Sequence, residues 1–106
     1  MTPLEEDFEA AVRDQITTVL RETDYRPTYY MQMVERHGAF MAAILLVRAP
    51  RPLEGFSRLW ELERLDLSVE ALVIEPRFAE LFSAEDRRKA GQRLRAHGYQ
   101  PPQSSH

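Results

Sequence analysis

The chain has 106 residues, the usual size of one domain; 43% of them are hydrophobic and 29% are charged. This composition supports a buried core and excludes a disordered or fibrous protein. The chain contains no cysteine, which excludes disulfides and thiolate chemistry and favours a reducing, cytoplasmic location. The net charge of −3 is too small to indicate an anionic partner.

No segment predicts membrane insertion or export. The longest apolar stretch, from Gly38 to Val47, has half of the roughly 20 residues that a membrane-spanning helix needs. The N-terminal region carries Glu5, Glu6 and Asp7, where a secretory signal would be positively charged. We therefore expect a cytoplasmic protein without membrane contact.

The first predicted helix runs from about Pro3 to about Arg21. Its apolar residues recur at the three- and four-residue spacing of an amphipathic helix. Thr2 is the expected N-cap, and Glu5 stands at the position that completes a capping box.

Two further helices are predicted on either side of Gly38. The first begins at Pro27 and Thr28 and ends at this glycine. Residues 39–47 are all apolar, so periodicity alone does not distinguish a helix from a buried strand, but their length and their alanine and methionine content favour a helix. A helix that is apolar on every side lies at the centre of a core or is half covered by another subunit.

Three short helices follow a proline-rich connection at residues 48–52. The first ends near Arg64 and Leu65. Ser68 is the expected N-cap of the second, which runs to about Glu75, and Ser83 is the expected N-cap of the third, which runs from 84 to about 97. Gly98 is placed to end this last helix.

The pattern as a whole predicts an all-α protein. No segment shows the alternation of apolar and polar residues that is typical of a strand. We expect one compact domain over residues 1–100, an orthogonal bundle of five to seven short helices, followed by a disordered polar tail at 101–106.

The sequence carries no catalytic or metal-binding motif. Its three histidines, at positions 37, 97 and 106, lie too far apart to pair on one helix face around a metal ion. Ser57 lacks the second glycine of a nucleophile elbow, and the four glycines form no phosphate-binding loop. We therefore expect no catalytic residue, metal, cofactor or small-molecule substrate.

Acidic residues surround the single tryptophan, at positions 61, 63, 66 and 70. Carboxylates beside an aromatic wall are one arrangement that raises a pKa for acid or base chemistry. Glu61 and Arg64 lie three residues apart on one predicted helix, however, which favours an ion pair. We predict that Trp60 is buried and that this segment locks two helices together. The residues of this structural key are Trp60, Glu61, Arg64, Asp66 and Ser68.

The last predicted helix is the candidate surface for nucleic acid or another anion. Four of its basic residues spread over about 160° of the helix, at 100° per residue, which is typical of a solvated outer face. Arg87 lies instead with the predicted buried stripe, and we predict that it pairs with an acid of residues 61–70. The candidate anion contacts are Arg87, Arg88, Lys89, Arg93 and Arg95.

Residues 25–33 and, more specifically, residues 55–70 resemble a family of small uncharacterised bacterial helical proteins. The second segment reads G-F-x-x-L-W-E-L-x-R-L-D-L-S-V-E, and the resemblance extends through Phe78, Leu81 and Phe82 to Tyr99. The family has no established reaction, cofactor or partner, so the resemblance implies membership alone. Family members carry a second glycine where this chain has Ala39, and often a glycine near Glu63.

Two functional hypotheses of different classes follow. The first is a non-enzymatic interaction module that binds a protein partner or a second copy of itself, with Tyr29, Tyr30 and Met33 as the candidate surface. The second is a small nucleic-acid-associated protein in which the helices around residues 65–68 form a helix-turn-helix-like unit and the basic last helix contacts phosphates. An enzyme ranks third.

Overall fold

Six α-helices and two short 3-10 helices build residues 2–101, the part of the chain that this computed structural model describes. No strand occurs in that range, so the predicted all-α class is confirmed. In chain order the elements are α1 (Pro3–Glu22), α2 (Thr28–His37), α3 (Ala39–Arg48), α4 (Glu54–Glu61), η1 (Leu65–Leu67), α5 (Val69–Val73), η2 (Pro76–Leu81) and α6 (Ala84–Ala96).

Most helix ends lie where the capping residues predict them. The Thr2 hydroxyl accepts from the Glu5 backbone N–H at 3.1 Å, and the Glu5 side chain completes the capping box. Gly38, with φ +83°, separates α2 from α3. Ser68 and Ser83 both cap a helix through the hydroxyl, as predicted.

α4 ends earlier than predicted, at Glu61 rather than near Arg64. The Arg64 N–H donates to the Leu59 carbonyl at 2.8 Å and the Glu63 N–H donates to the Trp60 carbonyl at 3.0 Å, which is the hydrogen-bond pattern of a Schellman motif. This motif places Glu63 in the left-handed region, with φ +59°, where glycine is preferred. The apolar spacing continues past the turn and therefore gave no signal of the helix end.

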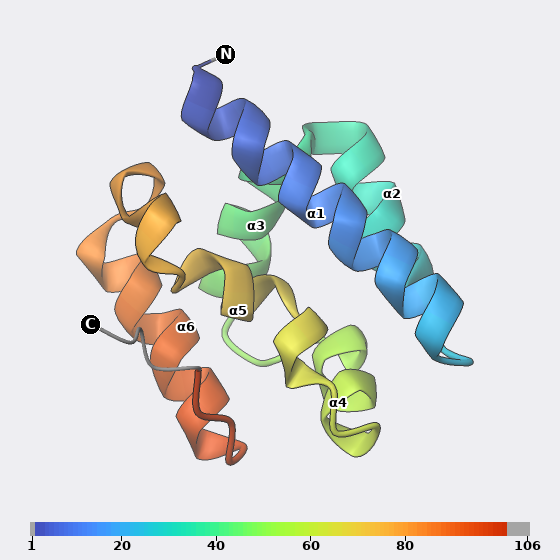
Figure 1. Cartoon of the computed structure of the whole chain (residues 1–106). Coiled ribbons are helices and arrows are strands. Elements are labelled where there is room, and N and C mark those ends of the chain that lie inside the picture. The colour runs from blue at the N-terminus through green and yellow to red at the C-terminus, as the bar shows by residue number, and fades with distance from the viewer. Residues whose placement is uncertain (1, 102–106) are drawn as a thin grey trace.

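α5 is the centre of the fold. All five of its residues are buried, and α1, α3 and α6 surround it (Figure 1). The larger core cluster joins α1 and α3 to α5, and within it the ring of Phe8 packs edge-on against those of Phe78 and Phe82 at 5.0 and 5.2 Å. The radius of gyration is 12.8 Å, close to the roughly 13 Å of a compact domain of this size.

α3 is confirmed as a helix, but only one side of it is covered. Ala42, Ala43 and Val47 are buried, whereas Met41 and Leu45 on the outer side are 44% and 42% exposed.

Among the described residues, no helix combines the length and apolar character required to cross a membrane.

Candidate binding pocket

An apolar pocket of about 60 Å³ lies between the start of α2, α4 and the start of α5. Four aromatic residues line it, together with four leucines contributed by α3, α4, η1 and the connection before α4. We call it the tyrosine pocket and define it by Tyr25, Tyr29, Tyr30, Phe56 and Glu70. One water molecule needs roughly 10–15 Å³ of cavity volume, so the pocket is large enough for several waters or for one side chain.

The connection between α1 and α2 places Tyr25 at the pocket wall. The Thr23 hydroxyl donates to the Val19 carbonyl at 2.8 Å and accepts from the Tyr25 N–H at 3.1 Å, which turns the chain after α1. The Tyr25 hydroxyl then lies so close to Gly55 that a Cβ at this glycine would be 2.8 Å from it. A glycine at position 55 therefore makes the room in which Tyr25 lies.

Tyr30 brings a buried phenol to the pocket. Its hydroxyl oxygen has no hydrogen-bond partner among the described residues. Burial raises the pKa of this phenol, and the nearby Glu70 carboxylate adds to the shift. The hydroxyl is therefore a buried polar group without a hydrogen bond, and its cost falls on the folded protein.

Glu70 is the one carboxylate that lines the pocket, and a guanidinium from α6 holds it. The side chains of Glu70 and Arg93 are 5% and 11% exposed, and Nη1 of Arg93 lies 3.0 Å from Oε2 of Glu70. Burial raises the pKa of Glu70, while Arg93 acts in the opposite direction. Arg93 also donates to the carbonyls of Leu46 and Ala49 at the end of α3, at 3.2 and 2.7 Å. One side chain therefore joins α3, α5 and α6.

Ser68 also lines the pocket, but its hydroxyl is occupied. It donates to the Leu65 carbonyl at 2.7 Å and accepts from the Ala71 N–H at 3.2 Å. Gln15 of α1 fixes the same turn, donating to the carbonyls of Asp66 and Ser68 at 3.3 and 2.8 Å. This serine is therefore a structural cap.

A second, wider hollow of about 480 Å³ adjoins the tyrosine pocket. The two have Tyr25, Tyr29, Leu53 and Gly55 in common as lining residues. The remaining lining of the second hollow is polar and includes both a basic and an acidic residue, Arg26 and Glu54. We call it the outer groove.

The predicted structural key is only partly correct. The prediction of a buried Trp60 is wrong, because this residue is 49% exposed. α4 ends at the next residue, Glu61, and leaves the Trp60 side of the helix uncovered. The indole lies against the His97 ring, with 5.3 Å between the ring centroids. Glu61 pairs with Arg58 at 3.0 Å, not with Arg64, because the turn after α4 takes Arg64 away from the helix face. Neither Trp60 nor Glu61 lines the tyrosine pocket.

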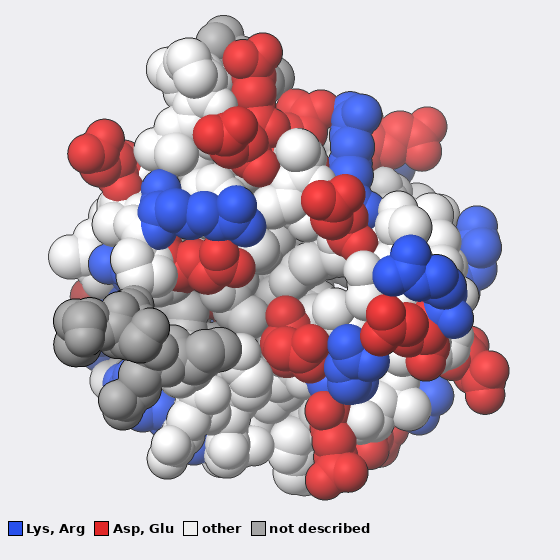
Figure 2. Space-filling model, viewed as in Figure 1, with Lys and Arg blue, Asp and Glu red and all other residues white. Residues whose placement is uncertain are grey.

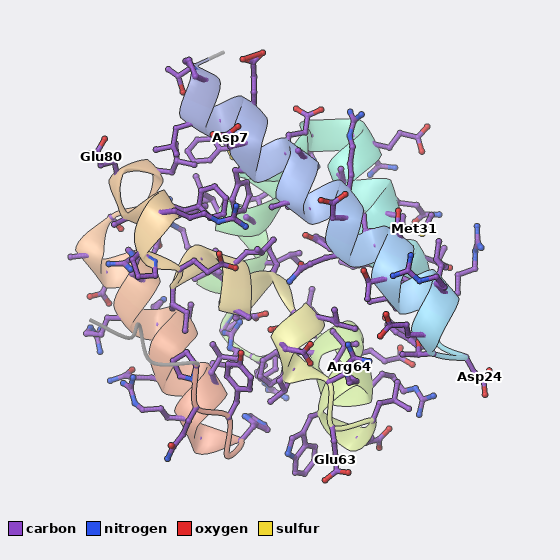
Figure 3. The ribbon with its side chains drawn as sticks, viewed as in Figure 1. Asp7, Asp24, Met31, Glu63, Arg64 and Glu80 are labelled. Atoms are coloured by element: carbon purple, nitrogen blue, oxygen red, sulfur yellow. The ribbon has the colours of Figure 1, made fainter. Side chains whose placement is uncertain are left out.

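Arg64 and Asp66 do form the predicted junction, with a different partner. Arg64 lies 3.1 Å from Asp66 and 2.9 Å from Glu22 at the end of α1. Figure 3 shows Arg64 between α4 and the end of α1, while Glu63 extends outward from the turn. This exposed cluster connects α1 to η1.

The basic residues of α6 do not share one surface. The prediction that Arg87 pairs with an acid of residues 61–70 is wrong: it donates to the carbonyls of Val73 and Ile74 at the end of α5, at 3.4 and 3.0 Å. Arg93 makes the predicted kind of pair in its place, with Glu70, and Arg88 pairs with Glu85 within α6. Only Lys89 and Arg95 of the five are exposed and without an ion pair in the described range.

The three residues of the predicted partner surface do not lie on one exposed surface. Tyr29 is 57% exposed at the mouth of the tyrosine pocket, whereas the Tyr30 hydroxyl is buried and Met33 is half-buried outside the pocket lining.

Within residues 2–101, no group of three or more histidine, aspartate or glutamate side chains is arranged to hold a metal ion.

The sequence analysis missed the Glu70–Arg93 pair, although both residues carry a signal. Glu70 is the only charged residue between Leu67 and Ile74, which indicates a buried charge. On a helical projection Arg93 lies only about 60° from Ala90, at the edge of the buried stripe. The contribution of Tyr25 and Gly55 to the pocket has no comparable signal, because it depends on a tertiary contact.

Comparison with known proteins finds no match to a protein-family model, to a curated protein sequence or to a solved structure. The resemblance of residues 25–33 and 55–70 to a bacterial family therefore stays a prediction.

Proposed function

We propose that this chain is a small non-enzymatic interaction domain that binds a protein partner through the tyrosine pocket and the outer groove. The observation that carries the proposal is the pairing of a pocket the size of one side chain with a wider groove beside it, whose lining includes the polar residues Arg26, Thr28, Gln32 and Glu54. Protein interfaces use this arrangement, in which an anchor side chain fills an apolar pocket and a polar rim surrounds it.

The polar groups of the pocket support binding rather than catalysis. The Ser68 hydroxyl is occupied by its cap, and Arg93 holds the Glu70 carboxylate. The pKa of Tyr30 is raised, which makes its hydroxyl a weaker acid. None of the three is poised as a nucleophile or a general base near neutral pH.

The nucleic-acid alternative has less support. Three of the five α6 cations bind groups of the protein itself, and on the face in Figure 2 the coloured acidic and basic side chains are interspersed. A salt titration of binding to duplex and single-stranded DNA tests this alternative, because phosphate contacts make affinity fall steeply with ionic strength. We expect no binding at low salt, and salt-sensitive binding that Lys89→Ala weakens would favour the alternative.

Selection from a random peptide display library tests the proposed function. We expect the enriched peptides to share an apolar or aromatic residue. Leu53 lines both the pocket and the groove, so Leu53→Trp should fill the shared mouth and weaken binding about tenfold or more. Leu45→Ala, on the uncovered side of α3, is the matched control and should not change the affinity.

Two results would contradict the proposal. The first is a failure of any peptide to enrich, and the second is equal affinity of the enriched peptides for the parent chain and Leu53→Trp. Sedimentation of the chain alone examines a second copy as the partner: self-association that Leu53→Trp abolishes would replace the foreign protein with another copy of this chain.

A further inference from the structure

The outer groove carries two opposite charges on its lining. Arg26, in the connection between α1 and α2, and Glu54, the first residue of α4, both line it. Both residues are exposed, and neither forms an ion pair within residues 2–101. The other two polar residues of the lining, Thr28 and Gln32, are uncharged and lie one turn apart on α2. The groove therefore presents one unmatched cation and one unmatched anion to a bound segment.

Glu54 has no ion pair because its expected partner on α4 is engaged elsewhere. Arg58 stands four residues later, at the spacing where a glutamate and a following cation ordinarily pair. Instead, Nη1 of Arg58 lies 3.0 Å from Oε1 of Glu61, and its guanidinium carbon lies 5.9 Å from the centre of the Tyr25 ring. Burial raises the pKa of the Tyr25 phenol, and the Glu54 carboxylate adds to the shift while Arg58 opposes it. The Glu54 carboxylate therefore acts on Tyr25, a lining residue of both hollows.

Arg26 likewise has no acid of its own. Glu22, four residues before it, is held by Arg64, with 2.9 Å between Oε1 and Nη1. Asp24, the nearest acid in the sequence, extends outward from the turn after α1 (Figure 3). Among the described residues, no acid other than Glu54 lines the outer groove, and the two groove charges do not pair with each other. The Arg26 guanidinium is therefore available to a carboxylate from outside the chain.

Opposite charges on one groove select a bound segment by its charge pattern. A segment with acidic side chains alone gains a contact at Arg26 and is repelled at Glu54, and a segment with basic side chains alone has the reverse difficulty. A segment that carries one of each satisfies both groups in one direction and places like charges together in the other. A segment anchored in the tyrosine pocket reaches this groove at once, because the two hollows have four lining residues in common.

We propose that the outer groove recognises a partner segment with two side chains of opposite charge, an acidic one at Arg26 and a basic one at Glu54, beside the anchor in the tyrosine pocket. This inference rests on the proposed function and names the charge pattern of the partner. Exposed ion pairs contribute modestly, so each should change the affinity about two- to fivefold. Together they set the direction in which the segment lies more than they drive its binding.

An exchange of the two groove charges tests the proposal. A peptide enriched by the parent chain from the display library is labelled, and its affinity is measured by fluorescence anisotropy. We expect the double variant Arg26→Glu with Glu54→Lys, which keeps the net charge of −3, to bind this peptide about tenfold or more weakly, because both contacts then join like charges. A peptide with its acidic and basic residues exchanged should regain the affinity. Glu35→Lys with Arg36→Glu exchanges two exposed charges of α2 outside both linings and is the matched control, with no change expected.

Neutral variants make the test independent of any loss of folding, since Glu54→Lys places a cation at the positive end of α4. Arg26→Gln and Glu54→Gln should each lower the affinity about two- to fivefold and reduce its dependence on salt. Enriched peptides without the charge pair, or equal affinity of one peptide for the parent chain and all of these variants, would overturn this inference. The proposed function stands in that case, provided that Leu53→Trp still weakens binding. Failure of any peptide to enrich would count against both.

Discussion

Arg93 of α6 and Glu70 of α5 form an ion pair that is almost completely buried beneath the tyrosine pocket. The pair holds the only carboxylate of the pocket lining in a neutral environment, and the same guanidinium binds the last carbonyls of α3. The pair therefore has two roles: it joins three helices, and it makes the pocket suitable for an uncharged occupant.

Removing one partner of this pair should destabilise the fold strongly. We expect Arg93→Met to lower the free energy of unfolding by about 3–5 kcal/mol, because it leaves a buried carboxylate unpaired. Adding Glu70→Gln should recover part of the loss. Urea denaturation measures both effects. Arg88→Met, which breaks an exposed pair within α6, is the control and should change little. Equal, small losses in Arg93→Met and Arg88→Met would show that the buried pair is not structurally important.

The unpartnered hydroxyl of Tyr30 should cost the free protein stability. Tyr30→Phe keeps the ring and removes the buried polar atom, so we expect the midpoint of thermal unfolding to rise and the free energy of unfolding to increase by about 1 kcal/mol. Stability lost on this substitution would mean that the hydroxyl has a hydrogen-bond partner in solution.

The left-handed residue after α4 offers a stabilising substitution. Glu63, at φ +59°, occupies the position of the Schellman motif where glycine avoids the steric cost of a Cβ. Glu63→Gly should raise the free energy of unfolding by about 0.5–1 kcal/mol after the entropy of glycine is subtracted. Glu63→Ala retains the Cβ and should give no such gain. An equal effect of the two substitutions would point to the carboxylate rather than the backbone.

The sequence predicted the helices well because their ends are encoded locally. Thr2, Ser68 and Ser83 provide hydroxyl caps and Gly38 provides a positive φ, so each boundary depends on a few neighbouring residues. The end of α4 was missed because a glutamate stands where the Schellman motif favours glycine, and a burial prediction made from a longer helix then failed at Trp60.

The candidate site was predictable only in part. Tyr29 and Tyr30 were identified from their aromatic character, and both line the pocket. The spacing does not predict the exchange of roles between Arg87 and Arg93, because Arg87 lies within the buried stripe and Arg93 only at its edge, and it is the position of α6 against α5 that brings Arg93 to Glu70. Such choices depend on tertiary packing rather than on spacing along the chain.

A second ion pair gives the stability a defined pH dependence. Arg48 at the end of α3 binds the buried Asp86 at the start of α6 at 2.9 and 3.0 Å, and this hydrogen bonding lowers the pKa of Asp86 from its usual 3.8. Because the folded state holds the carboxylate ionised, the unfolded state binds more protons, so the contribution is complete above pH 3.8 and is lost as the pH falls through the lower folded pKa.

Asp86→Asn isolates that contribution. We expect the substitution to destabilise the protein near neutral pH and the difference from the parent chain to disappear in strong acid. Denaturation curves measured between neutral pH and strong acid follow this difference. A difference independent of pH would assign the effect to packing at this site instead of to the charge of Asp86.

The structure of the chain bound to a peptide selected by display tests the central claim most directly. The account predicts an apolar or aromatic side chain of the peptide inside the tyrosine pocket, with the peptide backbone in the outer groove. A peptide bound on the Met41 and Leu45 side of α3, or along α6, with the tyrosine pocket left empty, would contradict it.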